Sequence, residues 1–375
     1  MLEHLAKEDY RDSTQPVALA GNSVSHAEAG RVLTEAGPAL HAELFGPEAS
    51  TEGPVQPAEL LILEADGSRY RTNEEDRKPQ ATAERPSKAA VEPGTPRKEE
   101  KPPSPQSEDD PLAEEERKRG WRENKVGLVV RALPGKTKLD GEYQPPEELV
   151  KTYVATTASL QEFEQDLLTE AQRRGAKYAK EVVSVSDNGH GLPTMWPRLF
   201  NALGLTLNMI TDFFHCAERL AACAAVIKGE GDACKRQRQS LYRRLRGWLW
   251  EGEVEKVIAL LRVEARRLAP QPAHLKDLAG QPAAQTLWGH LFYFEKYKET
   301  MDYPTYRAKG WPMGSGSVES ACGQFGGRVK HNRMRWSRRG ADALHVVKAA
   351  ILSGDDRWAK RWPPPIPVLE LPAAA

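Results

Sequence analysis

The segment from Gly310 to Ala341 carries a single carboxylate, Glu319, in a glycine-rich and cationic stretch. Between Arg307 and Arg339 it is the only acid beside eight Lys and Arg residues. So dense a run of like charges is costly for a surface that only faces water. The first functional expectation is therefore an anionic partner.

Glu319 is expected at the start of a helix. The sequence Gly-Ser-Gly-Ser at 314–317 is typical of a turn, with Ser317 as the N-cap and Val318 as the first helical residue. The helix dipole favours the charged form of a carboxylate in the first turn. Glycines on the same helical face, among them Gly323, would let a backbone or a ligand come close. The alternative is a carboxylate that only complements the dipole.

Two further acids follow apolar segments that are typical of strands. Asp66 comes after ELLILEA, and Asp187 comes after EVVSVS. A sheet that carries both aspartates could bring them to one edge beside Glu319. Such hard oxygen ligands suit Mg²⁺ or Mn²⁺, and two of these ions can activate a water or a 3′-hydroxyl for in-line phosphoryl transfer. The alternative is that each aspartate only forms a turn with the glycine that follows it.

Asp212 and His215 open another apolar helical pattern, DFFHCAERL. By themselves they are equally explained as an N-cap and a packed histidine. Residues 235–246 then carry six Lys and Arg and no acid, followed by Trp248 and Trp250. This stretch predicts either a surface for nucleic acid with stacking tryptophans or a solvated helix face above a core.

The composition excludes several classes of protein. The 375 residues include 53 basic and 53 acidic ones, and no apolar run approaches the roughly 18 residues of a membrane span. The acidic N-terminus is not typical of a signal peptide, so a cytoplasmic protein is expected. The four cysteines lack CxxC pairs and zinc-site spacing, which predicts reduced and mostly buried thiols.

The order of apolar patterns predicts an α/β fold. Strands are expected at 59–66, 125–133, from 153, at 181–187 and at 206–210. Helices are expected at 160–174, 195–203 and from 212. Residues 71–118 contain eight prolines and no aromatic residue, which is typical of a disordered segment. From 234 to 303 the pattern is only helical, with helices at 235–246, 254–268 and 286–298.

Several stretches of the chain resemble the Mutator-like bacterial insertion-sequence transposases of the ISKra group. They are LEADGSRYR, GWRENKVGLVV, VVSVSDNGHGL, ITDFFHCAERL and WPMGSGSVESACGQFGGRVKHNRMRWSRRGA. The resemblance implies an RNase H-like catalytic core with a DDE triad, interrupted by an all-α insertion domain. The residues that match the triad are Asp66, Asp187 and Glu319. Asp212 and His215 match the family's (C/D)xxH signature, which is thought to lie near the active site and the transposon end.

On this basis the chain divides into parts with different expected roles. Residues 1–54 are a truncated helical region, a possible helix-turn-helix remnant. The RNase H-like core comprises 55–71, 119–233 and 306–360, with a disordered insert at 72–118. The all-α insertion domain is 234–305, and 361–375 form a proline-rich tail.

The resulting hypothesis is a DDE transposase that uses Mg²⁺ or Mn²⁺ to cut DNA at transposon ends and to join the strand to target DNA. It would act as a homodimer or higher homo-oligomer on DNA in the nucleoid. The residues expected to contact DNA are Asp212, His215, Arg328, Lys330, Arg333, Arg335 and Trp336. The shortened N-terminus, the insert and the Asn-Gly after Asp187 depart from the family. Two alternatives stay open: a decayed or domesticated copy that binds DNA without cutting it, and a cellular nuclease of the same fold.

Overall fold

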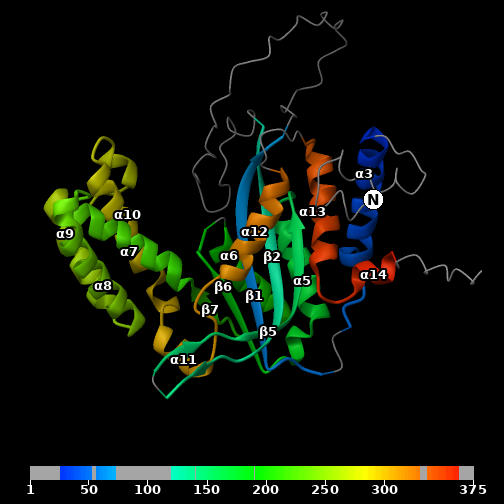
Figure 1. Ribbon diagram of the computed structural model, residues 1–375, viewed down its shortest axis with the longest axis horizontal. Coiled ribbons are helices and arrows are strands. Elements are labelled where there is room, and N and C mark those ends of the chain that lie inside the picture. Colours follow the sequence, from blue (N-terminus) through cyan, green and yellow to red (C-terminus); the bar gives the residue numbers. More distant parts are fainter. Residues whose placement is uncertain are drawn as a thin grey trace, which may run out of the picture.

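The computed structural model describes residues 26–52, 56–72, 120–139, 141–189, 191–329 and 336–362. These residues form a mixed α/β fold around a five-stranded sheet of order β5-β2-β1-β6-β7 (Figure 1). Its strands are β1 (Leu60–Arg71), β2 (Trp121–Leu133), β5 (Glu147–Thr156), β6 (Glu181–Ser186) and β7 (Met209–Thr211). β2 runs antiparallel to β1 and β5, whereas β1, β6 and β7 are parallel. A separate two-stranded sheet pairs β3 (Lys136–Thr137) with β4 (Tyr143–Gln144).

The helices follow the strands along the chain. They are α3 (His26–Phe45), α5 (Leu160–Arg173), α6 (Leu192–Leu203), α7 (Phe213–Lys228), α8 (Lys235–Trp250), α9 (Val254–Leu268), α10 (Pro282–Tyr297), α11 (Tyr303–Lys309), α12 (Gly316–Val329), α13 (Arg338–Leu352) and α14 (Arg357–Arg361). Short 3₁₀ helices lie at Ala176–Tyr178, Asp232–Cys234, Leu275–Leu278 and Lys298–Thr300. In the part of the chain that the structure describes, no helix is both long and apolar enough to cross a membrane.

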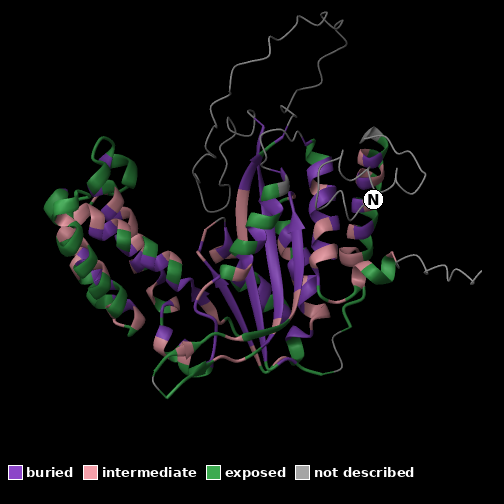
Figure 2. Ribbon diagram, viewed as in Figure 1, coloured by how far each residue is buried: buried purple, intermediate pink, exposed green. Residues whose placement is uncertain are grey.

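The central sheet is buried on both faces, as Figure 2 shows. Because side chains alternate along a strand, Leu61 and Leu63 of β1 pack into a core that includes residues of α5 and α6. Leu60 and Ile62 pack into the opposite core, which also contains Val318 of α12. The sheet therefore separates two cores, and α12 covers the second.

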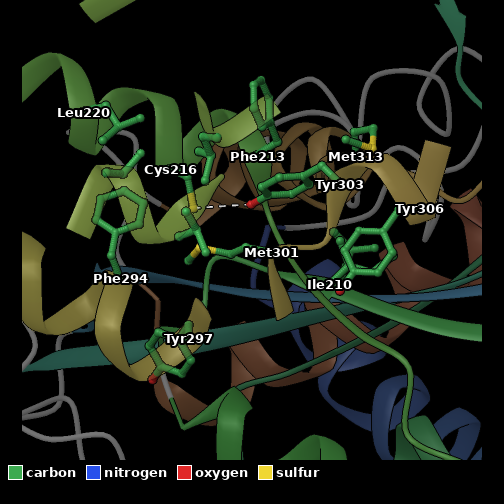
Figure 3. Close-up of a cluster of buried hydrophobic side chains, with 14 of the residues drawn as sticks. Ile210, Phe213, Cys216, Leu220, Phe294, Tyr297, Met301, Tyr303, Tyr306 and Met313 are labelled. Atoms are coloured by element: carbon green, nitrogen blue, oxygen red, sulfur yellow. Dashed lines mark hydrogen bonds between the residues drawn. The ribbon is translucent and has the colours of Figure 1, made fainter. Parts of the chain in front are cut away.

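Helices α8, α9 and α10 form a lobe beside the sheet (Figure 1). The junction between lobe and sheet is an apolar cluster to which β7, α7, α10 and α11 contribute (Figure 3). Rings of Phe213 and Tyr303 meet edge to face with centroids 5.1 Å apart, and the Tyr303 hydroxyl donates to the Thr211 carbonyl at 3.0 Å. Aromatic packing of this kind stabilises the junction beyond the area it buries.

A third cluster joins α3 to α13. Leu33 of α3 and Leu344 of α13 are both buried in it, together with Tyr70 near the end of β1. The helical character expected for residues 1–54 is thus present in α3. Its suggested origin as a helix-turn-helix remnant stays a prediction.

Several expectations about element ends are wrong. β1 does not end at Asp66, because residues 66–71 continue the antiparallel ladder with Trp121–Val126 of β2. α12 begins at Gly316, so Ser317 lies in its first turn and is not the N-cap. β2 and β5 begin at Trp121 and Glu147, earlier than predicted, because each continues to pair with its neighbour.

Other expectations are confirmed. α9 matches its predicted range, and the four cysteines are free, with Cys234 half-buried and the others buried. Between residues 234 and 303 the regular structure of the described chain is only helical. The predicted disordered insert and the proline-rich tail lie almost entirely outside the described residues.

Candidate active site

Three aspartates lie side by side across the parallel strands. The last β1–β6 pair is Glu64 with Val185, so continuing the register by two residues sets Asp66 opposite Asp187. The last β6–β7 pair is Ser186 with Thr211, so the next step sets Asp187 opposite Asp212. The Asp212 N–H continues this ladder by donating to the Ser186 carbonyl at 2.9 Å. The order across the sheet is therefore Asp66, Asp187, Asp212.

Strand alternation sets the face on which these carboxylates lie. Asp66 is an even number of residues from Leu60 and Ile62, so its side chain lies on the same face of β1. The side chains of Leu60 and Ile62 belong to the core that also contains Val318. Asp187 follows Val183 and Val185 in the same way, and both valines belong to that core. The row of aspartates therefore faces the side of the sheet that α12 covers.

A buried glutamate ties the start of α12 to β1. The Val318 N–H donates to Glu64 Oε2 at 2.8 Å, and Glu64 is only 3% exposed. Glu64 precedes Asp66 by two residues and so lies on the same face of the strand. Glu319 follows Val318 directly, and its carboxylate lies beside His215, with Asp212 and Asp187 among its charged neighbours.

Asp212 is the N-cap of α7 and also a clamp between distant parts of the chain. Its Oδ1 accepts the N–H groups of Phe214 and His215 at 2.6 and 3.0 Å. Its Oδ2 accepts the N–H and the hydroxyl of Ser315 at 2.5 and 2.6 Å. Burial acts to raise the pKa of Asp212, but the hydrogen bonds from His215 and Ser315 outweigh it and hold the pKa below its usual value. The clamp joins the ends of the segment that contains the helical lobe.

His215 stands between two carboxylates. Its Nδ1 lies 3.3 Å from Glu319 Oε1 and 3.6 Å from Asp212 Oδ2. The Asp212 carboxylate, with smaller contributions from Asp187 and Glu319, raises the pKa of His215 to about 9. Partial burial raises the pKa of Glu319, and His215 offsets part of that shift. With a pKa of about 9, His215 carries a positive charge at neutral pH beside Glu319.

Asp212, His215 and Glu319 could hold a metal ion, since one ligand atom of each lies within 4.8 Å of the others. Asp212 is the poorest donor of the three, because its two oxygens already accept four hydrogen bonds. Glu319 keeps 46% of its side chain exposed, and Asp66 and Asp187 are half-buried. Carboxylate oxygens are the donors that Mg²⁺ and Mn²⁺ prefer, and Asp212 and Glu319 supply them beside the His215 imidazole. Within the described residues, the structure does not bring Asp66 and Asp187 into this group.

The loop after β6 is held by the helical lobe. The Tyr293 hydroxyl of α10 donates to the Asp187 carbonyl at 3.1 Å, and the Gly189 N–H donates to Asp187 Oδ1 at 2.8 Å. Asn188 adopts a left-handed conformation with φ of 64° and donates to Thr211 Oγ1 at 2.7 Å. A non-glycine residue at positive φ is uncommon, and asparagine tolerates it better than most. These hydrogen bonds fix the backbone conformation of the loop and therefore the direction of the Asp187 side chain.

Sequence reasoning missed several residues of this site. Glu64 lies inside the quoted LEADG motif, and its spacing of two from Asp66 was a usable signal. Ser315 lies in the GSGS turn, but no local pattern indicates that it binds Asp212. Tyr293 carries no signal at all, because its role depends on how the lobe docks.

The structure places the residues expected to contact DNA in different surroundings, and some of them lie outside the described residues. Trp336 is 3% exposed and belongs to the buried cluster that joins α3 to α13, so the structure does not bring its indole to the surface. The side chain of Arg328 and all of Lys330, Arg333 and Arg335 lie outside the described residues. Asp212 and His215 lie beside Glu319, as described above.

Comparison of the chain with protein-family models, with curated proteins and with solved structures gives no match. The fold and the site define a mixed α/β protein with a candidate metal site, formed by Asp212, His215 and Glu319, where α7 and α12 begin.

Proposed function

We propose that the chain is a DDE transposase, a metal-dependent enzyme that cuts DNA at transposon ends and joins the freed strand to target DNA. One observation supports the proposal: the register of β1 and β6 leads to Asp66 and Asp187, and Glu319 lies beside Asp212 and His215 at the end of the neighbouring strand β7. In this proposal, three separated parts of the sequence would supply the carboxylates of one site. The resemblance to the ISKra group assigns the triad to the same three residues.

The fold agrees with this proposal at the level of topology. A mixed sheet with one antiparallel strand, order β5-β2-β1-β6-β7, suits an RNase H-like core. The lobe of α8, α9 and α10 would be the all-α insertion domain, since it enters the chain after Asp212 and leaves before Ser315. The clamp between those two residues explains how the core can stay intact around so large an insertion.

Each residue has a defined task in this proposal. Asp66, Asp187 and Glu319 would hold Mg²⁺ or Mn²⁺, and Asp212 would position Glu319 by fixing Ser315 and the start of α12. When bound, the ions activate a water or a 3′-hydroxyl and neutralise charge on the leaving oxygen. His215 would place a positive charge beside Glu319 that can balance the phosphate of the DNA.

The test is cleavage of a supercoiled plasmid that carries the element's flanking DNA, with Mg²⁺ or Mn²⁺. Asp187→Asn and Glu319→Gln are each expected to lower the rate at least about 100-fold, since each removes a ligand of the ions. Glu218→Gln is the matched control, because Glu218 lies close enough to influence Glu319 but belongs to no triad. If wild type binds DNA without metal-dependent nicking, the chain is a DNA-binding relic and not an active enzyme. Nicking that persists in both triad variants refutes the assignment of the site.

A further inference from the structure

Helix α8 presents a cationic face that the proposed chemistry leaves unused. The helix carries six Lys and Arg and no acid among its sixteen residues. Leu241, Leu245 and Leu249 form its buried stripe, so the opposite face, with Arg236 and Arg243, is exposed to solvent (Figure 2). Ser240 and Gly247 lie on that same exposed face. We call these four residues, with Arg246 on their flank, the α8 face.

An ordinary solvated helix does not explain the α8 face. The neighbouring helix α9 mixes acids such as Glu255 and Glu264 with its cations, and Arg267 pairs with Glu264 at 2.8 Å. The acids nearest to α8 in sequence, Glu230, Asp232 and Glu251, lie beyond its two ends. Cations in the first turn of α8 also oppose the helix dipole, which costs helix stability. Their presence therefore indicates a partner with negative charge.

A glycine on the α8 face gives an independent indication. A Cβ added at Gly247 would meet no atom within 4 Å, so the fold does not require glycine there. Glycine inside a helix costs up to about 1 kcal/mol relative to alanine. The fold neither needs nor favours glycine at position 247. On an exposed cationic face, this glycine allows a partner's backbone to approach the helix closely.

The C-terminal end of α8 packs near the candidate active site. The Arg246 guanidinium lies over the Phe213 ring at 5.0 Å, and Phe213 follows Asp212 directly. Trp250, at the end of the helix, packs edge to face on Phe213 at 4.9 Å. Arg307 holds this end by donating to the Trp250 carbonyl at 2.7 Å. The C-terminal end of α8 therefore packs against the residue that follows Asp212.

We propose that the α8 face binds the sugar-phosphate backbone of the substrate DNA and guides it to the carboxylates. This inference rests on the proposed function, since it takes DNA as the substrate. Arg236, Arg243 and Arg246 contact phosphates, and Gly247 leaves room for the backbone beside the helix. The contacts are independent of base sequence, because they involve phosphates only.

The test measures binding of a fluorescein-labelled DNA duplex by anisotropy over a range of salt, in a Glu319→Gln background that removes cleavage. The combined variant R236Q/R243Q/R246Q is expected to lower the slope of log K against log salt by about 2 to 3, because each phosphate contact contributes roughly 0.9. The control K256Q/R266Q/K276Q removes the same charge from exposed sites of the same lobe and should leave the slope unchanged. Thermal melts confirm that both variants fold.

A second pair of variants tests the approach of the backbone without changing charge. Gly247→Gln should weaken DNA binding several-fold, whereas Ala259→Gln, at an exposed site of α9, should not. If the α8 variants bind DNA as the controls do while the parent binds it firmly, the α8 face is not a DNA contact. If the parent itself fails to bind DNA, the proposed function fails first, and the inference falls with it.

Discussion

Glu64 is a buried carboxyl group whose pKa lies well above its usual value. Burial in the core under α12 raises its pKa from 4.5 to about 8, although the hydrogen bond from Val318 works in the opposite direction. The side chain has no solvent to stabilise its charge and only one backbone donor. Below a pH of about 8 the residue therefore links β1 to α12 without a buried charge.

This protonation predicts a pH dependence of stability. The unfolded chain releases the Glu64 proton near 4.5, and the folded chain keeps it to about 8. Between these values the folded state binds more protons, so the free energy of unfolding falls as the pH rises, by up to about 1.4 kcal/mol per pH unit. Glu64→Gln keeps an oxygen acceptor for Val318 and should lack this fall. Urea denaturation from about pH 5 to 9 compares the two proteins, and parallel pH curves would contradict the assignment.

Asp212 should contribute more to the free energy of unfolding than an ordinary N-cap residue does. Asp212→Asn exchanges one of two accepting oxygens for an NH₂ group, which must then face the donors of Phe214 and His215 or those of Ser315. We expect a loss of about 2 to 3 kcal/mol in the free energy of unfolding. Asp302, the exposed N-cap of α11, accepts only the Thr305 N–H and is the control. Asp302→Asn should cost under about 1 kcal/mol, and equal losses in urea denaturation would exclude the clamp.

At the scale of residues, the sequence predicted which elements carry the acids better than it predicted the hydrogen bonds around them. Asp187 and Glu319 follow a strand and open a helix as expected, because local apolar patterns define both elements. Asp66 was expected in a turn, yet it lies within a strand, because its pairing partner comes more than fifty residues later. The bonds of Glu64 and Ser315 join distant segments, so no local pattern reveals them.

Among the elements, α3 and α13 pack unusually closely. A Cβ built at Gly37 of α3 would lie 2.5 Å from both Cα and Cβ of Ala343 in α13. Backbone atoms cannot yield as the end of a flexible side chain can. The glycine therefore sets the distance between the two helices.

Gly37→Ala should destabilise the protein although alanine favours the helix. Overpacking costs about 1 to 3 kcal/mol, against a gain in helix propensity of at most about 1 kcal/mol. Gly323 of α12 is the control, since a Cβ there meets nothing within 4 Å. Gly323→Ala should leave the melting temperature unchanged or raise it. A Gly37→Ala protein as stable as wild type would show that the helices lie farther apart.

Element types were predictable where an element carries its own signal. α9 has a regular apolar stripe and begins and ends where the sequence indicates. Strand ends were less predictable, because pairing extends β2 and β5 through polar residues such as Asn124 and Lys151. The buried Asn124 receives the Ser68 hydroxyl as a hydrogen bond at 2.6 Å, which only the folded sheet supplies.

On the scale of the molecule, the helical lobe is part of the site's support. The long separation of Asp187 from Glu319 already indicated an inserted helical segment. The sequence could not show that α10 returns to hold the loop of Asp187 through the Tyr293 hydroxyl. The lobe also packs Arg219 over the Tyr293 ring at 3.9 Å, which restrains that hydroxyl. The docking of the lobe against the sheet and the position of Asp187 are therefore coupled.

Tyr293→Phe tests this coupling, because it removes one hydroxyl and keeps the ring. Loss of a single hydrogen bond of about 1 kcal/mol should lower the rate of metal-dependent plasmid cleavage roughly 5-fold. The Mn²⁺ concentration for half-maximal rate should rise, since Asp187 would hold the ion less firmly. Tyr178→Phe, at an exposed site that is 64% accessible, should change neither quantity. If cleavage and metal requirement of Tyr293→Phe equal those of wild type, the lobe supports the fold alone, and the position of Asp187 is set within the sheet by the bonds of Asn188 and Gly189.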